Sequence, residues 1–444
     1  MSFRNSLRHA SFGFLVSLMS APVSAAELPT PLTPEDFIET DPMEVAIGRQ
    51  LFFDPILSGN RNIACATCHH PTLGSTDAVS LSIGEGGFGL GTKRIVDEDN
   101  HPISRIPRNA PALWNLGLKS TKVMFHDGRL SLDENAPFGI KTPKGLEMER
   151  PVKSLVAAQA MLPPTSDNEM AGHGNENPIA QAGHEGRIKG PNGIWAQLAA
   201  RVDAIPEYRR AFDWVIGADR PIHMTDIANA IGAYIAFEFR CTDSPFDRFL
   251  DGRASLEPAA LRGVELFYGK AGCADCHSGA NFTDQSFHAI AVPQIGPGKG
   301  PKHLEIADIG RGAVTGNPED DYRFRTPTLR NITLTAPYGH AGAYADLEDM
   351  VRHHLNPTDA LGTYRPEMAV LHKTPTPLAD DFKILSDPEE MIRIAAATEI
   401  EPISLSDGEI SDLIAFLGSL TDSQPVGSRL GIPSSVPSGL PIEN

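Results

Sequence analysis

Hydrophobic positions recur at helical spacing in three stretches of the chain, and a helix start signal precedes each stretch. The first follows Asp41-Pro42-Met43-Glu44, where an N-cap acid stands before a first-turn proline. The second follows Thr225, and the third follows the capping-box pattern Ser406-Asp407-Gly408-Glu409. The three apolar faces consist of Val45, Gly48, Leu51 and Phe52, of Ile227, Ile231, Tyr234 and Ile235, and of Ile410, Leu413, Ile414, Leu417 and Leu420. Strand signals are sparse, so the pattern predicts a mainly α fold.

The segments between these helices show no hydrophobic period. Residues 71–110 and 279–325 have the composition of long ordered loops. Residues 162–194 are polar and rich in Gly, Asn and His, and we expect a long surface excursion between helices rather than a domain. Residues 421–444 are rich in Pro, Ser and Gly, which predicts an irregular tail, either wrapped on the surface or disordered.

The first 25 residues have the pattern of a secretory signal peptide. Arg4 and Arg8 precede the apolar run from Ser11 to Met19, which is too short to span a bilayer. Val23-Ser24-Ala25 then offers small residues for cleavage after Ala25. No other stretch is long and apolar enough for a membrane span, so we expect a mature periplasmic protein without one.

The chain is strongly acidic, with a formal net charge of −18. Removing Arg4 and Arg8 with the signal peptide takes this to −20, because residues 1–25 contain no Asp or Glu. Such a surface repels nucleic acid and anionic lipid, and it favours a basic partner or a neutral small substrate. Solubility alone is the other explanation of this charge.

Four of the five cysteines form two close pairs, Cys65-Ala66-Thr67-Cys68-His69 and Cys273-Ala274-Asp275-Cys276-His277. Both match the attachment motif of haem c, in which two thiols add to the vinyl groups of one haem. The adjoining histidines, His69 and His277, are then the proximal iron ligands. A zinc site would need the pairs close together in sequence, and a thioredoxin-like motif would not require the histidine. The remaining Cys241 is expected to be a buried apolar residue.

Two haem motifs about 210 residues apart predict two tandem cytochrome c-like haem domains with long ordered loops. We expect the signal peptide at 1–25, an N-terminal haem domain at 26–222 and a C-terminal haem domain at 223–420. The irregular tail occupies 421–444.

A set of short landmarks surrounds the two motifs in a fixed order. They are Gly48-Arg49-Gln50-Leu51-Phe52-Phe53-Asp54, Pro107-Arg108-Asn109-Ala110-Pro111, Phe125-His126-Asp127-Gly128-Arg129, Leu146-Glu147-Met148, Phe246-Asp247-Arg248-Phe249-Leu250, Leu329-Arg330-Asn331-Ile332 and Leu334-Thr335-Ala336-Pro337-Tyr338. With these landmarks, nearly the whole mature chain resembles the bacterial di-haem cytochrome c peroxidase and MauG superfamily.

The resemblance implies that hydrogen peroxide reacts at the N-terminal haem and that the C-terminal haem relays electrons. It places the family's catalytic acid–base glutamate on Glu147. It also implies a calcium ion between the domains, bound at Asn109 and at the backbone carbonyls of Thr335 and Pro337. Dimers are usual among the relatives, so a homodimer is a further expectation.

The chain departs from the family's pattern at the N-terminal haem. In peroxidases that need reductive activation, a loop histidine blocks that iron, and the matching position here is Glu85. We therefore expect an open sixth iron position at rest, with Glu85 assisting or tuning the acid–base group. The alternative is that Glu85 is a solvated residue of a mobile, glycine-rich loop.

The distal ligand of the C-terminal haem is a second departure. The family usually places Met there and MauG places Tyr, whereas the aligned residue here is His354. Neighbours on a helix point about 100° apart, so only one of His353 and His354 can face the iron. We favour His354, with His353 at the surface or facing a propionate, and Met350 is the rival ligand one turn earlier.

The third departure is His126, which stands where the family usually has an inter-haem Trp. Imidazole is harder to oxidise than indole, so we expect electrons to take another route between the haems.

Three functions are compatible with these residues. The first is a periplasmic peroxidase that draws electrons from a small cytochrome c or cupredoxin. The second is a MauG-like enzyme that oxidises a protein side chain through a high-valent bis-Fe(IV) state shared by both haems. The third is a non-enzymatic electron carrier, which the distal acid Glu147 disfavours.

Overall fold

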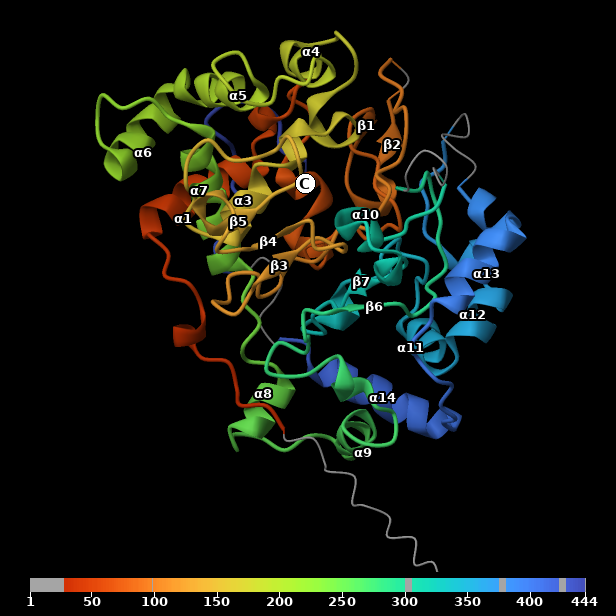
Figure 1. Ribbon diagram of the computed structural model, residues 1–444. Helices are drawn as coiled ribbons and strands as arrows, with labels where there is room; N and C mark the ends of the chain where they lie inside the picture. Colours follow the sequence, from red (N-terminus) through yellow and green to blue (C-terminus); the bar gives the residue numbers. More distant parts are fainter. Residues whose placement is uncertain (1–27, 98, 300–305, 375–380, 423–428, 444) are drawn as a thin grey trace, which may run out of the picture.

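The computed structural model describes residues 28–97, 99–299, 306–374, 381–422 and 429–443 (Figure 1). The expected signal peptide lies outside the described residues. The helices of the first half of the chain are α1 (Pro42–Phe53), α2 (Cys65–Cys68), α3 (Leu155–Ala160), α4 (Pro178–His184), α5 (Ile194–Asp203), α6 (Pro206–Ile216) and α7 (Met224–Glu238). Those of the second half are α8 (Pro245–Leu250), α9 (Pro258–Phe267), α10 (Gly312–Thr315), α11 (Leu347–Leu355), α12 (Pro357–Thr363), α13 (Pro388–Ala396) and α14 (Asp407–Ser419).

Strands are short, and all of them pair in antiparallel fashion. They are β1 (Gly87–Phe88), β2 (Ile95–Val96), β3 (Val123–Met124), β4 (Leu130–Leu132), β5 (Ile140–Lys141), β6 (Phe287–His288) and β7 (Phe324–Arg325). The mainly α fold with long loops is therefore confirmed. None of the described helices combines the length and the hydropathy needed to cross a bilayer.

Helices α1 and α7 form the centre of the first hydrophobic core. Phe52 of α1 packs against Tyr234 of α7 with ring centroids 5.1 Å apart. Gly48 lets the two backbones approach, because a Cβ there would collide with the carbonyl oxygen of Ala230. Since α7 belongs to this core, the expected boundary at 222/223 is wrong: the first body extends to Cys241, and the second begins at α8.

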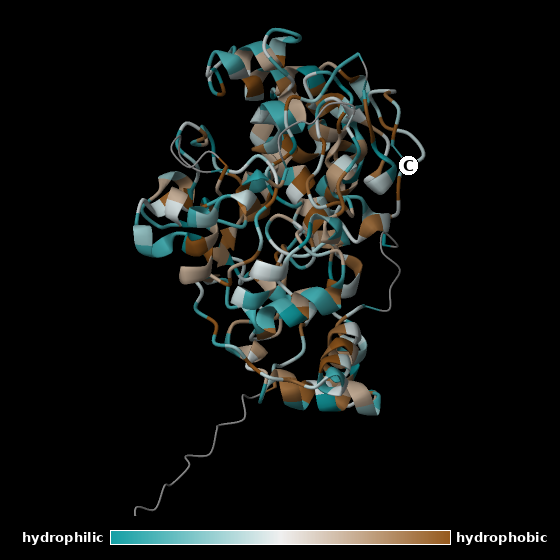
Figure 2. Cartoon of the chain, turned by 90° about the vertical axis from the view of Figure 1, so that its right-hand side faces the viewer, coloured by the Kyte–Doolittle hydropathy of each residue, from teal (hydrophilic) through white to brown (hydrophobic). Residues whose placement is uncertain are grey.

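The second body is built on the pair α9 and α14 (Figure 1). The capping box that predicted α14 is present, since the Ser406 backbone N–H donates to Glu409 at 2.7 Å. Phe267 of α9 and Phe416 of α14 meet with ring centroids 4.9 Å apart. Figure 2 shows hydrophobic and hydrophilic residues alternating along the same helices, as amphipathic helices require.

The segment 162–194 is not the plain surface excursion that its composition predicts. It contains a π-helical turn at Asp167–Ala171 and helix α4, and it buries Met170, Ala171 and Ile179 in the first core. Its hydrophobic side chains therefore help to build the N-terminal body.

The tail is irregular and wraps on the protein, one of the two expected alternatives. Within 429–443, Val436 is buried in the first core, and Leu430, Ile432, Leu440 and Ile442 pack against that core. The chain therefore leaves α14 in the second body and ends on the first.

Candidate functional site

The two haem motifs place their histidines in the same way. His69 directly follows α2, and its Nδ1 lies 3.2 Å from the Ser75 carbonyl oxygen. His277 likewise has Nδ1 3.2 Å from the Phe282 carbonyl oxygen. A carbonyl only accepts, so Nδ1 carries the proton in each ring and the Nε2 lone pair is free for a metal. Burial lowers the pKa of His69, and burial together with the nearby His354 lowers the pKa of His277 to about 4.

The cysteine pairs also fit haem attachment. All five cysteines are free, and burial raises the pKa of Cys65 to about 12 and that of Cys276 to about 11. Neutral thiols of this kind are poor metal ligands but are available for thioether bonds. Among the described residues, Cys276, Asp284 and His288 have the spacing of a metal site, but Cys276 belongs to the second haem motif, and haem attachment would consume its thiol. Cys241 is fully buried, as expected.

His354 completes the C-terminal site. Its Nδ1 donates to the Met350 carbonyl oxygen at 2.8 Å, which again leaves Nε2 free. The ring centroids of His277 and His354 lie 6.4 Å apart. An iron held between two imidazoles at about 2 Å from each nitrogen requires a centroid separation of about 6.3 Å. The pair therefore fits a haem iron with one imidazole on each face.

His353 is not at the surface, which was one of the two expected positions. It is fully buried, its Nε2 donates to the Ile290 carbonyl oxygen at 2.7 Å, and its Nδ1 lies 3.0 Å from the Tyr344 hydroxyl. Both ring nitrogens are therefore occupied, so His353 cannot serve as a ligand.

The surroundings of the N-terminal haem motif are different. Among the described residues, no second imidazole makes with His69 the ring contact that His354 makes with His277. Glu85 is buried rather than solvated, and its Oε1 accepts hydrogen bonds from the side-chain amides of Asn60, Asn62 and Asn100 at 2.8, 2.9 and 2.6 Å. Its Oε2 is buried without a hydrogen-bond partner among the described residues.

Glu147 does not occupy the position that its expected role requires. It lies in an exposed loop, where its Oε2 pairs with Lys189 at 2.7 Å and its Oε1 accepts from the Gly145 backbone N–H at 2.8 Å. The Lys189 hydrogen bond, followed by those of the backbone, lowers its pKa to about 2. A surface carboxylate that stays ionised is a poor proton donor, so the geometry argues against Glu147 as the acid–base group.

Glu169 is the acid that the sequence reasoning missed. It lies on the π-helical turn and acts electrostatically on the thiol of Cys68, so it is next to the N-terminal haem motif. Burial raises the pKa of Glu169, and the charges of Arg129 and Lys299 oppose this only in part. A weak signal was available in the pair Glu169-Met170, which repeats Glu147-Met148 and is one of four Glu-Met pairs in the sequence.

Glu85 and Glu169 belong to one site. The Glu85 backbone N–H donates to the Asn168 carbonyl oxygen at 3.0 Å, directly before Glu169. A Cβ on Gly84 would lie 2.9 Å from the Glu169 Cα, so the absence of a side chain lets the two segments touch. Glu169, with its raised pKa, is therefore suited to proton exchange next to the haem motif, with the Glu85 loop packed against it.

His126 lies where the two halves of the chain meet. Its Nε2 is 3.1 Å from the Asn109 carbonyl oxygen, and its own carbonyl accepts from the Arg325 backbone N–H at 2.7 Å. Burial and the charge of Arg108 lower its pKa to about 4, which keeps the imidazole neutral. His340 is nearby, stacked on Phe324 with centroids 3.7 Å apart.

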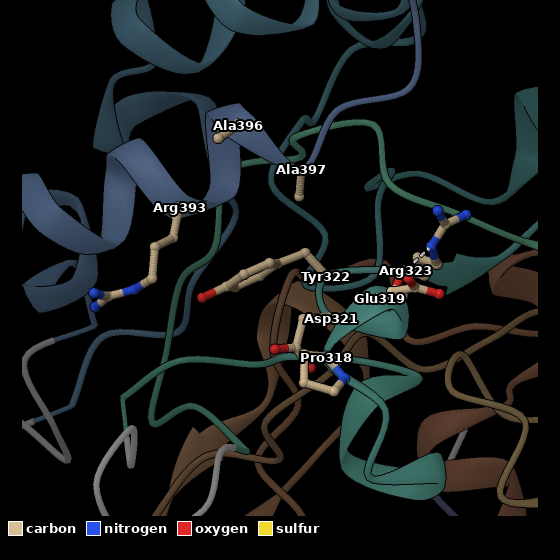
Figure 3. A pocket seen from close by; sticks show the side chains of 8 residues that line it. All are labelled: Pro318, Glu319, Asp321, Tyr322, Arg323, Arg393, Ala396 and Ala397. Atoms are coloured by element: carbon tan, nitrogen blue, oxygen red, sulfur yellow. Dashed lines mark hydrogen bonds between the residues drawn. The ribbon is translucent and has the colours of Figure 1, made fainter.

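A separate surface cavity of about 370 Å³ lies between α13 and the 318–323 segment (Figure 3). Tyr322 extends across it, but its hydroxyl donates to Glu390 at 2.6 Å, and Arg393 pairs with the same carboxylate. None of the lining residues belongs to a haem motif, so this cavity is not part of the haem sites.

Comparisons with known proteins agree with this arrangement. The sequence profile described as "Di-haem cytochrome c peroxidase" matches residues 42–255. The cytochrome c551 peroxidase of Nitrosomonas europaea is 30% identical over 335 residues, which are 75% of this chain and 78% of that protein. The methylamine utilization protein MauG of Methylorubrum extorquens is 28% identical, covering 88% and 79%. A solved MauG-like protein associated with microbial copper homeostasis matches with a TM-score of 0.60 at 26% identity, covering 90% of this chain and 95% of that one. This chain therefore belongs to the di-haem cytochrome c peroxidase family.

Proposed function

We propose that this protein reduces hydrogen peroxide to water at the N-terminal haem, with electrons relayed through the C-terminal haem from a small cytochrome c or cupredoxin. The observation that carries the proposal is the asymmetry between the two sites. His277 faces a second imidazole, whereas the surroundings of the His69 motif include the buried carboxyl group of Glu85 and the half-buried carboxyl group of Glu169. A pure electron carrier needs no such acids.

The haem iron, when bound, supplies the place where peroxide binds and the electron exchange that its reduction requires. Glu169 accepts the proton of the nearer peroxide oxygen and delivers it to the farther oxygen, which leaves as water. Two electrons and two further protons complete the conversion of one peroxide into two waters. Glu85, held by three amide groups, orients water or peroxide through its unpartnered Oε2.

A MauG-like oxidation of a protein side chain is the second candidate. It is favoured by the pair His277 and His354, since two nitrogen ligands give a lower potential than a histidine and a methionine. Such an iron gives up electrons readily. Poor turnover with reduced cytochrome c, together with a long-lived product of the peroxide reaction, would select this candidate over the first.

The remaining parts of the proposal concern location and calcium. The signal-peptide pattern supports export to the periplasm, where haem c is attached.

For calcium, the Asn109 amide nitrogen donates to the carbonyl oxygens of Val79 and Ser80, which leaves its Oδ1 for a cation. The Asn109 backbone N–H donates to the His340 carbonyl at 2.9 Å and so holds it beside the segment containing Thr335 and Pro337.

The acid–base assignment is tested with Glu169→Gln and, as the matched control, Glu147→Gln. We expect the first to slow the reaction of the ferric protein with peroxide by about 10²–10⁴ and the second to leave it unchanged. The pH profile adds an independent readout. If Glu169 is the base, the rate should fall as the pH drops through a value above 4.5, because the pKa of Glu169 is raised from that ordinary value. If Glu147 were the base, the rate would fall only near pH 2. A slow Glu147→Gln with a normal Glu169→Gln would reverse the assignment.

A further inference from the structure

The last described residue of the chain reaches the N-terminal haem motif. The Glu443 carboxylate accepts from the Thr67 hydroxyl at 2.9 Å and from the Gly89 backbone N–H at 2.9 Å, and it pairs with Arg94 at 3.2 Å. Thr67 is the residue before Cys68 in the motif, and Glu443 acts electrostatically on the Cys68 thiol. A carboxylate from the far end of the sequence therefore lies beside the first haem site.

Arg94 connects this carboxylate to the loop that carries Glu85. Its guanidinium donates to the carbonyl oxygens of Ile83, Gly84, Gly87 and Gly89 at 2.6–2.8 Å. These four carbonyls stand on both sides of Glu85, so one side chain fixes the path of the whole loop.

The Arg94 side chain is only 2% exposed, so its buried positive charge is stable only beside an anion. Among the described residues, Glu443 is the acid that pairs with it. Guanidinium stays charged at all relevant pH values, so the loss of Glu443 would leave a buried cation next to the haem motif.

The position of Glu443 is fixed by the rest of the tail. Arg49 donates to the Gly431 carbonyl at 3.0 Å, and the Ser438 hydroxyl donates to Asp54 at 2.6 Å. The Leu430 backbone N–H donates to Glu238 at 3.0 Å, and Val436 is buried. These anchors lie on or beside α1 and α7, which hold the tail along the first body up to its end.

We propose that Glu443 is a positioning residue for the N-terminal haem site. Its ion pair keeps Arg94 bonded to the carbonyl oxygens of the Glu85 loop and so holds that loop against the haem motif. The inference rests on the proposed function in so far as the positioned site is where peroxide reacts. The C-terminal tail is then a part of that site, although it emerges from the other body.

The test uses the full-length haem-loaded protein with Glu443→Gln, Glu443→Asp and the control Glu401→Gln, which removes a charge at an exposed position. All three partners of Glu443 donate hydrogen bonds to it. In Glu443→Gln the side-chain amide nitrogen can only donate, so it would face one of these donors without forming a hydrogen bond. We expect hydrogen exchange in residues 83–96 to accelerate by about tenfold in Glu443→Gln. We also expect the reduction potential of the N-terminal haem to rise while that of the C-terminal haem stays unchanged, because a negative charge has left one site only.

The reaction with peroxide should slow by about tenfold in Glu443→Gln, recover in part in Glu443→Asp and stay normal in Glu401→Gln. Unchanged loop exchange together with an unchanged N-terminal potential would overturn the proposal, and so would an equal shift of both potentials. If the unaltered protein fails to react with peroxide, the proposed function is wrong, while exchange and potential still decide whether Glu443 positions the loop.

Discussion

The replacement Arg108→Gln probes the ion network that joins the two halves of the chain. Arg108 donates to both oxygens of Asp308 at 2.6 and 2.7 Å and to Asp127 at 2.6 Å. The three side chains are only 3–7% exposed. Removing the cation leaves Asp308 buried without its partner, and breaking a buried pair in this way costs about 3–5 kcal/mol. We expect a loss of that size in the free energy of unfolding.

The measurement is urea unfolding of the haem-loaded protein at pH 7, followed by haem absorbance. The control is Arg210→Gln, which breaks an ion pair with Glu207 whose side chains are 67% and 56% exposed, and we expect a loss below about 1 kcal/mol. The double variant Arg108→Gln/Asp308→Asn should be more stable than Arg108→Gln alone, because it removes the unpaired charge. Equal losses in Arg108→Gln and Arg210→Gln would refute the reasoning.

The stabilisation by the Arg108–Asp308 ion pair depends on pH in a defined direction. Burial alone would raise the pKa of Asp308, but the charge and hydrogen bonds of Arg108 hold it well below its usual range. The stabilisation is therefore complete above the ordinary carboxyl pKa and is lost as the pH falls through the lowered value. The difference between the unaltered protein and Arg108→Gln should shrink on acidification, when Asp308 is protonated. A difference that grows at low pH would contradict this explanation.

Three further variants test the haem sites. In His354→Ala, the low-spin signal of the C-terminal haem in the resting electron paramagnetic resonance spectrum should be replaced, since one of its two nitrogen ligands is gone. In His353→Ala that signal should persist, while the loss of two buried hydrogen bonds lowers the free energy of unfolding by about 1–3 kcal/mol. In Glu85→Gln, the remaining carbonyl oxygen keeps the three amide bonds, so stability should change by less than about 1 kcal/mol while the peroxide rate, measured by stopped flow, falls by about tenfold. A rate equal to that of the unaltered protein would make Glu85 purely structural.

The sequence predicted what depends on local pattern. The motifs at Cys65 and Cys273 define their chemistry by spacing alone, and α1 and α14 begin at the predicted caps Asp41 and Ser406. The predicted cap of α7, Thr225, is wrong, because that helix begins at Met224 with His223 as its N-cap. The same period shows which face of a helix is apolar but not which core covers it. Helix α7 was therefore assigned to the wrong half of the chain, although its buried face was identified correctly.

Features made by distant segments were beyond this reasoning. The environment of His353 comes from Tyr344 and Ile290, so helical geometry shows that only one of His353 and His354 can face the iron, but it does not show that His353 is buried. Glu169 lies on a five-residue π-helical turn, which has no hydrophobic period and resembles a polar loop in sequence. The composition of the segment predicts a surface loop, and that prediction gives no reason to single out Glu169.

The asymmetry of the two sites follows from the kind of backbone that supplies the distal side. His354 lies on the regular helix α11, where its Nδ1 is bonded within the same helix, so its direction toward His277 is fixed locally. At the first site, Glu85 lies in a loop and Glu169 on a single π-helical turn, so fewer local backbone hydrogen bonds hold these segments than hold a regular helix. Distant groups must hold these segments instead: three asparagine amides on Glu85, and Arg94 on the carbonyls around it. A site that binds a substrate can be built from irregular backbone of this kind, because a loop held by side-chain hydrogen bonds moves more easily than a regular helix. Variants that remove these asparagine or arginine hydrogen bonds should therefore slow the reaction with peroxide and leave the spectrum of the C-terminal haem unchanged.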